Sequence, residues 1–86
     1  MHSLGIFKYS KEGDTVYSSE YGVGSIIYLY SAWFMYRIHV RFSETSTQQY
    51  NGKGVKCSEY PNQTQTLFNS YSSFLNMNKK DKKHTL

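Results

Sequence analysis

The chain has 86 residues and carries a formal net charge of +4 at pH 7. A chain of this length buries only about 60% of its unfolded surface, which predicts one domain with a modest core and argues against a large catalytic cleft. Nine Tyr and five Phe residues supply much of the apolar content, and such rings are typical of antiparallel strands.

Most of the positive charge lies near the C-terminal end of the sequence. Residues 1–78 contain six Lys or Arg and five Asp or Glu, a balance of +1, whereas four Lys and one Asp in 79–86 add +3. A basic tail on a nearly neutral body is typical of a solvated segment, although it also adds non-specific affinity for polyanions.

Cysteine content and the N-terminal residues bear on the compartment. Cys57 is the only cysteine, which excludes an intramolecular disulfide and favours a reducing environment. Residues 1–8 lack the continuous apolar core and small-residue cleavage site of a signal peptide. We therefore expect a cytoplasmic protein.

The first half of the chain alternates between β-prone runs and glycine-containing turns. We expect strands at residues 6–9, 15–17 and 25–30, separated by a turn at Gly13 and a loop over 21–24. Gly13 is suited to its turn because glycine adopts positive φ without steric cost. Residues 25–30 are β-branched or aromatic on both faces, so their buried face cannot be assigned from periodicity.

Residues 37–42 alternate strictly between polar and apolar side chains, which is typical of a half-buried strand. The apolar set of this strand should face inward. The residues of this set are Ile38, Val40 and Phe42.

The uncharged stretch 21–36 is the one place where a transmembrane helix could lie. It is shorter than the roughly 20 apolar residues that a span needs, and it is diluted by glycine, serine and tyrosine. Extending it to residue 42 adds Arg37, His39 and Arg41, which are costly inside a bilayer. A strand is favoured, while a single-pass membrane peptide spanning 21–42 stays open as an alternative.

The second half of the chain is expected to return as a strand over 48–50 and to turn at Asn51-Gly52, a strong hairpin signal. Pro61 argues against a central strand in 58–65. Residues 66–68 could close the sheet, yet the apolar residues of 67–75 also recur at helical spacing. Both structures stay open for 67–75, and we expect a frayed lysine-rich tail beyond Asn76.

Several runs occur in an order that resembles small SH3/Tudor-like barrels: GDTVY (13–17), YGVGSI (21–26), IHVRF (38–42), QYNGK (49–53) and QTLF (65–68). Similar domains are the C-terminal Tudor-like domain of bacterial DNA-repair helicases, the polymerase-interacting domain of CarD-type transcription factors, and stand-alone proteins of phages and prophages. The stand-alone group is the most similar.

The resemblance implies a mainly β fold, with a five-stranded SH3/Tudor-like barrel over 1–68 and a polar, lysine-rich tail with a short helix or disorder over 69–86. It also implies a protein encoded by a phage or mobile element, with transcription or defence machinery as candidate partners. The interior of such a barrel would be filled by five apolar residues: Val16, Ile26, Ile38, Val40 and Phe42. A fold of this kind does not by itself define a function.

The sequence contains no recognisable catalytic or metal-binding pattern. His2, His39 and His84 are scattered, and a single cysteine gives no metal-ligand spacing. A nucleophile elbow and a phosphate-cradling glycine loop are both missing from the sequence. We therefore expect no enzymatic activity, no cofactor, no metal and no small-molecule substrate.

Aromatic residues in or beside the expected loops form the first candidate binding site. Small barrels of this type commonly gather such side chains into a groove or cage for a protein partner. The candidates are Tyr17, Tyr21, Trp33, Phe34, Tyr36 and Tyr50.

Alternate cationic residues on the strand 37–42 form the second candidate site. Side chains two residues apart on a strand are about 6.6 to 6.8 Å apart, a spacing that suits successive phosphates of a nucleic acid strand. Neighbouring rings, Tyr28, Tyr30 or Trp33, could stack on bases. The residues assigned to this weak nucleic-acid-backbone site are Arg37, His39, Arg41, Lys79 and Lys80.

Overall fold

A computed structural model describes residues 5–57 and 64–76. In these residues the chain forms a 3₁₀ helix η1 (Gly5–Phe7), five strands and a short helix over 71–76. The strands are β1 (Thr15–Ser18), β2 (Gly22–Leu29), β3 (Ile38–Ser43), β4 (Ser46–Tyr50) and β5 (Leu67–Phe68). The mainly β prediction with five strands and a short C-terminal helix is confirmed.

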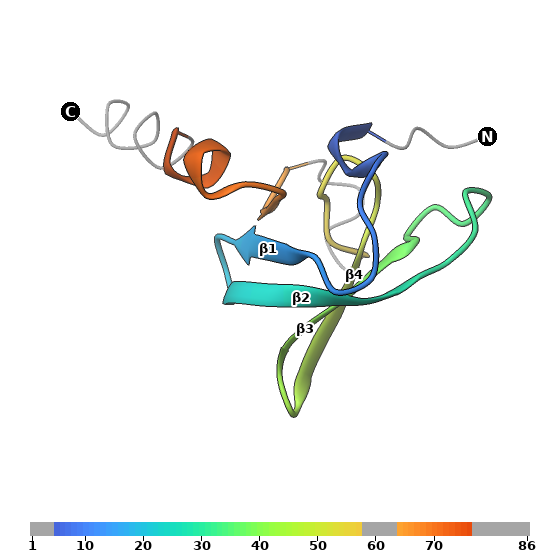
Figure 1. The fold of residues 1–86 in the computed structure, drawn as a ribbon, viewed down its shortest axis with the longest axis horizontal. Coiled ribbons are helices and arrows are strands. Elements are labelled where there is room, and N and C mark those ends of the chain that lie inside the picture. The colour runs from blue at the N-terminus through green and yellow to red at the C-terminus, as the bar shows by residue number, and fades with distance from the viewer. Residues whose placement is uncertain (1–4, 58–63, 77–86) are drawn as a thin grey trace.

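The five strands make one antiparallel sheet in the order β4-β3-β2-β1-β5. Figure 1 shows the sheet curling, with the turn between β3 and β4 pointing away from the strand pair β1-β2. A register shift between Ile26 and Tyr28 lies where β2 pairs with β3, and bulges of this kind bend a strand and increase its twist. The result is a curled half-barrel.

A turn over residues 51–55, which we call the closing turn, joins the two edges of the sheet. The carbonyl oxygen of Gly54 accepts hydrogen bonds from the backbone N–H groups of Thr66 and Leu67, at 3.0 and 3.1 Å. The Asn51 side chain accepts bonds from the N–H groups of Lys53 and Val55, at 2.8 and 3.1 Å. The start of β5 is thereby tied to the end of β4.

The closing turn differs from the two-residue hairpin that Asn51-Gly52 predicts. Tyr50 and Lys56 form a bridge across it, and its positive φ lies at Gly54 rather than at Gly52. The wider turn is favoured because the Asn51 side chain satisfies two backbone donors that a two-residue turn would not present.

The strand expected at residues 6–9 is wrong. Gly5–Phe7 is a 3₁₀ helix, and the N–H groups of Lys8 and Ser10 donate to the carbonyl oxygens of Gly5 and Phe7, at 3.3 and 3.2 Å. The chain turns tightly here because only Phe7 of this segment enters the core, while Ile6 stays exposed.

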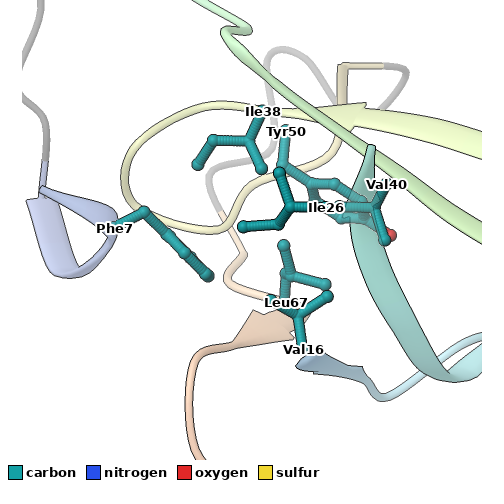
Figure 2. Close-up of a cluster of buried hydrophobic side chains, with 7 residues drawn as sticks. All are labelled: Phe7, Val16, Ile26, Ile38, Val40, Tyr50 and Leu67. Carbon is teal, nitrogen blue, oxygen red and sulfur yellow. The ribbon is translucent and has the colours of Figure 1, made fainter. Parts of the chain in front are cut away.

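Seven buried side chains form the main core cluster in the described part of the chain. They come from η1 and from each of the five strands, and Figure 2 shows them converging: Phe7, Val16, Ile26, Ile38, Val40, Tyr50 and Leu67. Four of the five expected core residues are confirmed. Phe42 is only partly buried and packs against the cluster, because a register shift between Arg41 and Ser43 interrupts the alternation of β3.

The segment 67–75 contains both of the structures that the sequence left open. Leu67–Phe68 pairs with β1, and residues 71–76 are helical. The hydroxyl of Ser70 accepts a hydrogen bond from the N–H of Ser73 at 3.2 Å, as in a helix N-cap. Phe74 packs against Phe68, with ring centroids 5.9 Å apart. The tail expected beyond Asn76 lies outside the described residues.

The stretch considered as a membrane span is occupied by β2, the connection after it, and β3. Within residues 5–57 and 64–76, no helix has both the length and the apolar character needed to cross a bilayer.

We predict that Gly54→Ala destabilises the fold by about 2–4 kcal/mol. Gly54 has φ of 82°, and a Cβ there would collide with the carbonyl oxygen of Leu67. Gly13→Ala is the matched control, because Gly13 has φ of 93° but open space around it, so only the backbone penalty of about 1–2 kcal/mol applies. Urea unfolding measures the loss in free energy of unfolding for each variant. Equal losses for Gly54→Ala and Gly13→Ala would mean that the closing turn does not restrain the sheet.

We also predict alkaline destabilisation that depends on Tyr50. Burial raises the pKa of the Tyr50 hydroxyl to about 12, and the nearby Ser18 hydroxyl opposes this increase. No described residue makes a well-formed hydrogen bond with the Tyr50 hydroxyl itself. The folded state therefore holds this proton more tightly than the unfolded chain. The resulting stability, about 2–3 kcal/mol, is complete below about pH 10 and is lost as the pH rises through about 12.

The matched variant for this pH prediction is Tyr50→Phe. Urea unfolding of both proteins from about pH 9 to about pH 12 should show the wild type losing stability relative to the variant, since other titrating groups are common to both. If the difference in unfolding free energy between the wild type and Tyr50→Phe stays constant across this pH range, the Tyr50 hydroxyl ionises freely in the folded protein.

Candidate binding surface between β2 and β3

Residues 30–37 connect β2 to β3, and we call them the aromatic loop. The loop is closed at its base, where the N–H of Tyr30 donates to the carbonyl oxygen of Arg37 at 2.8 Å. Inside it, the N–H of Phe34 donates to the carbonyl oxygen of Ser31 at 3.1 Å. In Figure 1 this loop projects from the sheet on the side away from the helix 71–76.

Large apolar side chains of the aromatic loop face solvent. The exposed fractions are 71% for Trp33, 57% for Phe34 and 44% for Met35, and Tyr28 at the end of β2 is 50% exposed. Scattered apolar residues are normal on a protein surface, but a cluster of this kind is typical of an interaction site.

Tyr30 organises the rings around it. Its ring centroid lies 4.7 Å from that of Tyr28 in an edge-on arrangement, and 5.5 Å from that of Phe34. It also stacks on His39, at 6.4 Å with an interplanar angle of 17°. Such contacts reduce the rotamer freedom of the exposed rings before any partner arrives.

The three cationic residues predicted for β3 lie on the same outer face as these tyrosines. Tyr28 is opposite His39 in the register, and Tyr30 is opposite Arg37, and opposite residues of an antiparallel pair share a face. The inward positions between them are filled by Ile38 and Val40. Arg41 follows on this face and is exposed.

Arg37 lies just before β3 and is half-buried. Its Nε and Nη1 atoms are enclosed and have no hydrogen-bond partner in the described part of the chain. Part of the Arg37 guanidinium is therefore shielded from solvent at the base of the aromatic loop.

A shallow open groove of about 410 Å³ begins at Arg41. One wall comes from β1 and β2, including Thr15 and Val23, and the other from the end of β3 with Glu44 in the following turn. The groove is a recess on the face that carries the cationic residues.

Three of the six aromatic residues predicted for partner contact, Trp33, Phe34 and Tyr36, lie together in the aromatic loop. Tyr17 lies elsewhere: it is half-buried and packs against Tyr71 and Phe74 of the C-terminal helix, at 5.5 and 6.3 Å between ring centroids. The structure therefore does not assemble all six into one cage.

Tyr50 as a partner contact needs correction, because its side chain is fully buried in the core. The residues before it gave no signal of this, because Ser46–Gln49 are all polar and Tyr50 is the one buried residue of β4. Its position beside Asn51-Gly52 suggested an exposed loop ring, but the wide closing turn draws Tyr50 inward.

Tyr21 belongs to a separate cluster around Lys56. The Lys56 ammonium, which is buried, lies 3.1 Å from Oε1 of Glu20 and donates to the Tyr21 hydroxyl at 3.1 Å. It also lies 5.1 Å from the centre of the Tyr21 ring, which stacks on Phe42. These contacts connect Lys56, the residue after the closing turn, to the loop between β1 and β2, so we interpret them as structural.

Lys79 and Lys80, assigned to the nucleic-acid site, lie outside the described residues. Within the described ranges, no group of three His, Cys, Asp or Glu residues could hold a metal ion. Sequence reasoning did not identify Met35 or the enclosed guanidinium of Arg37. The absence of Gly and Pro from 30–37 was the available signal that this connection is more than a tight turn.

Comparison of the chain with protein-family models, with curated proteins and with solved structures gives no match. The resemblance to SH3/Tudor-like barrels therefore stays a prediction. The fold and the surface together define a small antiparallel β protein with an exposed aromatic loop.

Proposed function

We propose that this chain is a small non-catalytic binding or adaptor module that contacts a protein partner through the aromatic loop. The observation that carries the proposal is the exposure of Trp33 and Phe34 on a closed loop whose base is held by hydrogen bonding and ring contacts. Burial against a partner is the simplest way to remove this apolar surface from water.

The composition of the loop supports a protein partner. Trp, Tyr and Arg are the residues that most often dominate the binding energy of protein interfaces, and the loop and its flanks contain all three. Rings that are already packed against one another lose little conformational entropy on binding. The predicted resemblance to phage proteins and polymerase-interacting domains makes transcription or defence machinery the first partners to test, with the cytoplasm as the expected site of action.

A second candidate function is weak binding of a nucleic-acid backbone. It is favoured by the placement of Arg37, His39 and Arg41 on one face, next to Tyr28 and Tyr30. Cations interleaved with rings are typical of single-strand binding surfaces. Binding of this kind would weaken steeply with added salt, whereas burial of apolar rings would not.

The test is a selection of random peptides displayed on phage against the immobilised protein, followed by measurement of the selected peptides in solution. We expect the double variant Trp33→Ser/Phe34→Ser to lose roughly 100-fold or more in affinity, because two central aromatic contacts are each worth about 2 kcal/mol. Tyr9→Ser is the control, because Tyr9 is 87% exposed but lies outside the aromatic loop.

The unfolding midpoints of the double variant and the control should both match the wild type, since the replaced side chains are exposed. Equal peptide affinity for all three proteins would contradict the proposal. The nucleic-acid candidate would be favoured if no peptide binds while an oligothymidylate does. That binding should weaken with added salt and should be lost in Arg41→Met.

A further inference from the structure

Tyr17 and Phe68 form a pair of rings on the outer face of the sheet. They are opposite each other where β1 pairs with β5, and opposite residues of an antiparallel pair share a face. Their chain neighbours Val16 and Leu67 belong to the core cluster on the other face. Phe68 is only 3% exposed, yet it is not a member of that cluster. Contacts on the outer face therefore bury it.

The ring of Phe74, in the helix 71–76, lies against both members of this pair. Its centroid is 6.3 Å from that of Tyr17 and 5.9 Å from that of Phe68. Tyr71 adds a contact to Tyr17 at 5.5 Å. Phe74 is the one residue of 71–76 that is not exposed. The helix is thus attached to the sheet chiefly through a single half-buried ring.

Apart from that ring, the helix contains little that stabilises it. Residues 71–76 make fewer than two helical turns, and isolated helices shorter than about 12 residues are marginal in water. Serine and asparagine, which supply half of these residues, have low helix propensity. The N–H of Phe74 reaches the carbonyl oxygen of Ser70 at 3.2 Å, at the long end of the usual range. A segment of this kind opens locally while the sheet stays folded.

We propose that the helix 71–76 is a displaceable cover, and that Tyr17 and Phe68 form a second binding surface for an aromatic side chain of a protein partner. Phe74 shows which chemistry fits, because its ring already lies against both members of the pair. A partner segment that presents Phe or Tyr makes the same ring contacts once the helix moves aside. This surface is separate from the aromatic loop, so the inference goes beyond the proposed function and does not depend on it.

The closed helix acts as an internal competitor for this surface. A partner binds the open form, so its apparent affinity is reduced in proportion to the fraction of molecules that are open. Removing the Phe74 ring raises that fraction and therefore raises the affinity for an external ring. In this arrangement Tyr17 has the partner-contact role that the sequence predicts for it.

The experiment uses the full chain and a synthetic peptide, NSYSSFLN, that copies residues 69–76. The control peptide has Ser in place of its Phe. Chemical shifts of the Tyr17 and Phe68 backbone amides, measured by NMR during titration, give the affinity of the wild type, of Phe74→Ser and of Leu75→Ser. Leu75→Ser is the matched variant, because it replaces an exposed apolar residue of the same helix by the same residue.

We expect Phe74→Ser to bind the peptide about tenfold or more tightly than the wild type does. Leu75→Ser should stay near the wild-type affinity, and the control peptide should shift neither amide in any of the three proteins. The inference would be overturned if the peptide binds the wild type and Phe74→Ser equally, or if it does not shift the two amides in Phe74→Ser.

Hydrogen exchange of the wild type tests the opening of the helix without any variant. The N–H of Ile26 donates to the carbonyl oxygen of Asp14 at 2.9 Å within the sheet. We expect the Phe74 N–H to be at least about 100-fold less protected than the Ile26 N–H, because the helix opens without the sheet. Equal protection of the two amides would show that the helix is released only by global unfolding, which would overturn the inference even if Phe74→Ser folds poorly.

Discussion

The carbonyl oxygen of Gly54 joins the two edges of the sheet, and the positions of the core side chains depend on that contact. By accepting hydrogen bonds from the start of β5, it brings Leu67 under the sheet and turns Tyr50 inward. A two-residue turn at Asn51-Gly52 would have paired β4 with the segment after the turn, without this contact to β5. The wider closing turn makes a curled half-barrel from a sheet whose first and last strands would otherwise be separate edges.

Closure produces a small core, and this limits how many rings the fold can bury. The chain has nine Tyr, five Phe and one Trp, yet Phe7 and Tyr50 are the aromatic members of the main cluster in the described residues. Several other rings pack in pairs at the periphery, as Tyr17 does with Phe74. In the aromatic loop, Trp33 and Phe34 stay mostly exposed, although the Phe34 ring contacts that of Tyr30. We propose that this excess of aromatic residues, which the core cannot accommodate, serves the binding of a partner.

The alternating pattern of residues 37–42 was sufficient to predict β3 and the burial of Ile38 and Val40, because a period of two can only place them on one face. Single residues near turns were harder to predict. The inward turn of Tyr50 depends on contacts with β5, and the partial exposure of Phe42 depends on a bulge, and both arise from pairing between distant segments. Arg37 was expected on the same face as His39 and Arg41, and the structure places it there. The enclosure of its Nε and Nη1 atoms is not something that the alternating pattern specifies.

The central claim is that the aromatic loop is a surface in the free protein, and Trp33 reports on it directly because it is the only Trp in the chain. Iodide quenching of its fluorescence in the folded protein and in the urea-unfolded chain compares its exposure in the two states. We expect quenching constants of the same order, as for a side chain that is 71% exposed. A folded protein whose Trp is shielded from iodide would show that the loop packs onto the sheet and offers no binding surface.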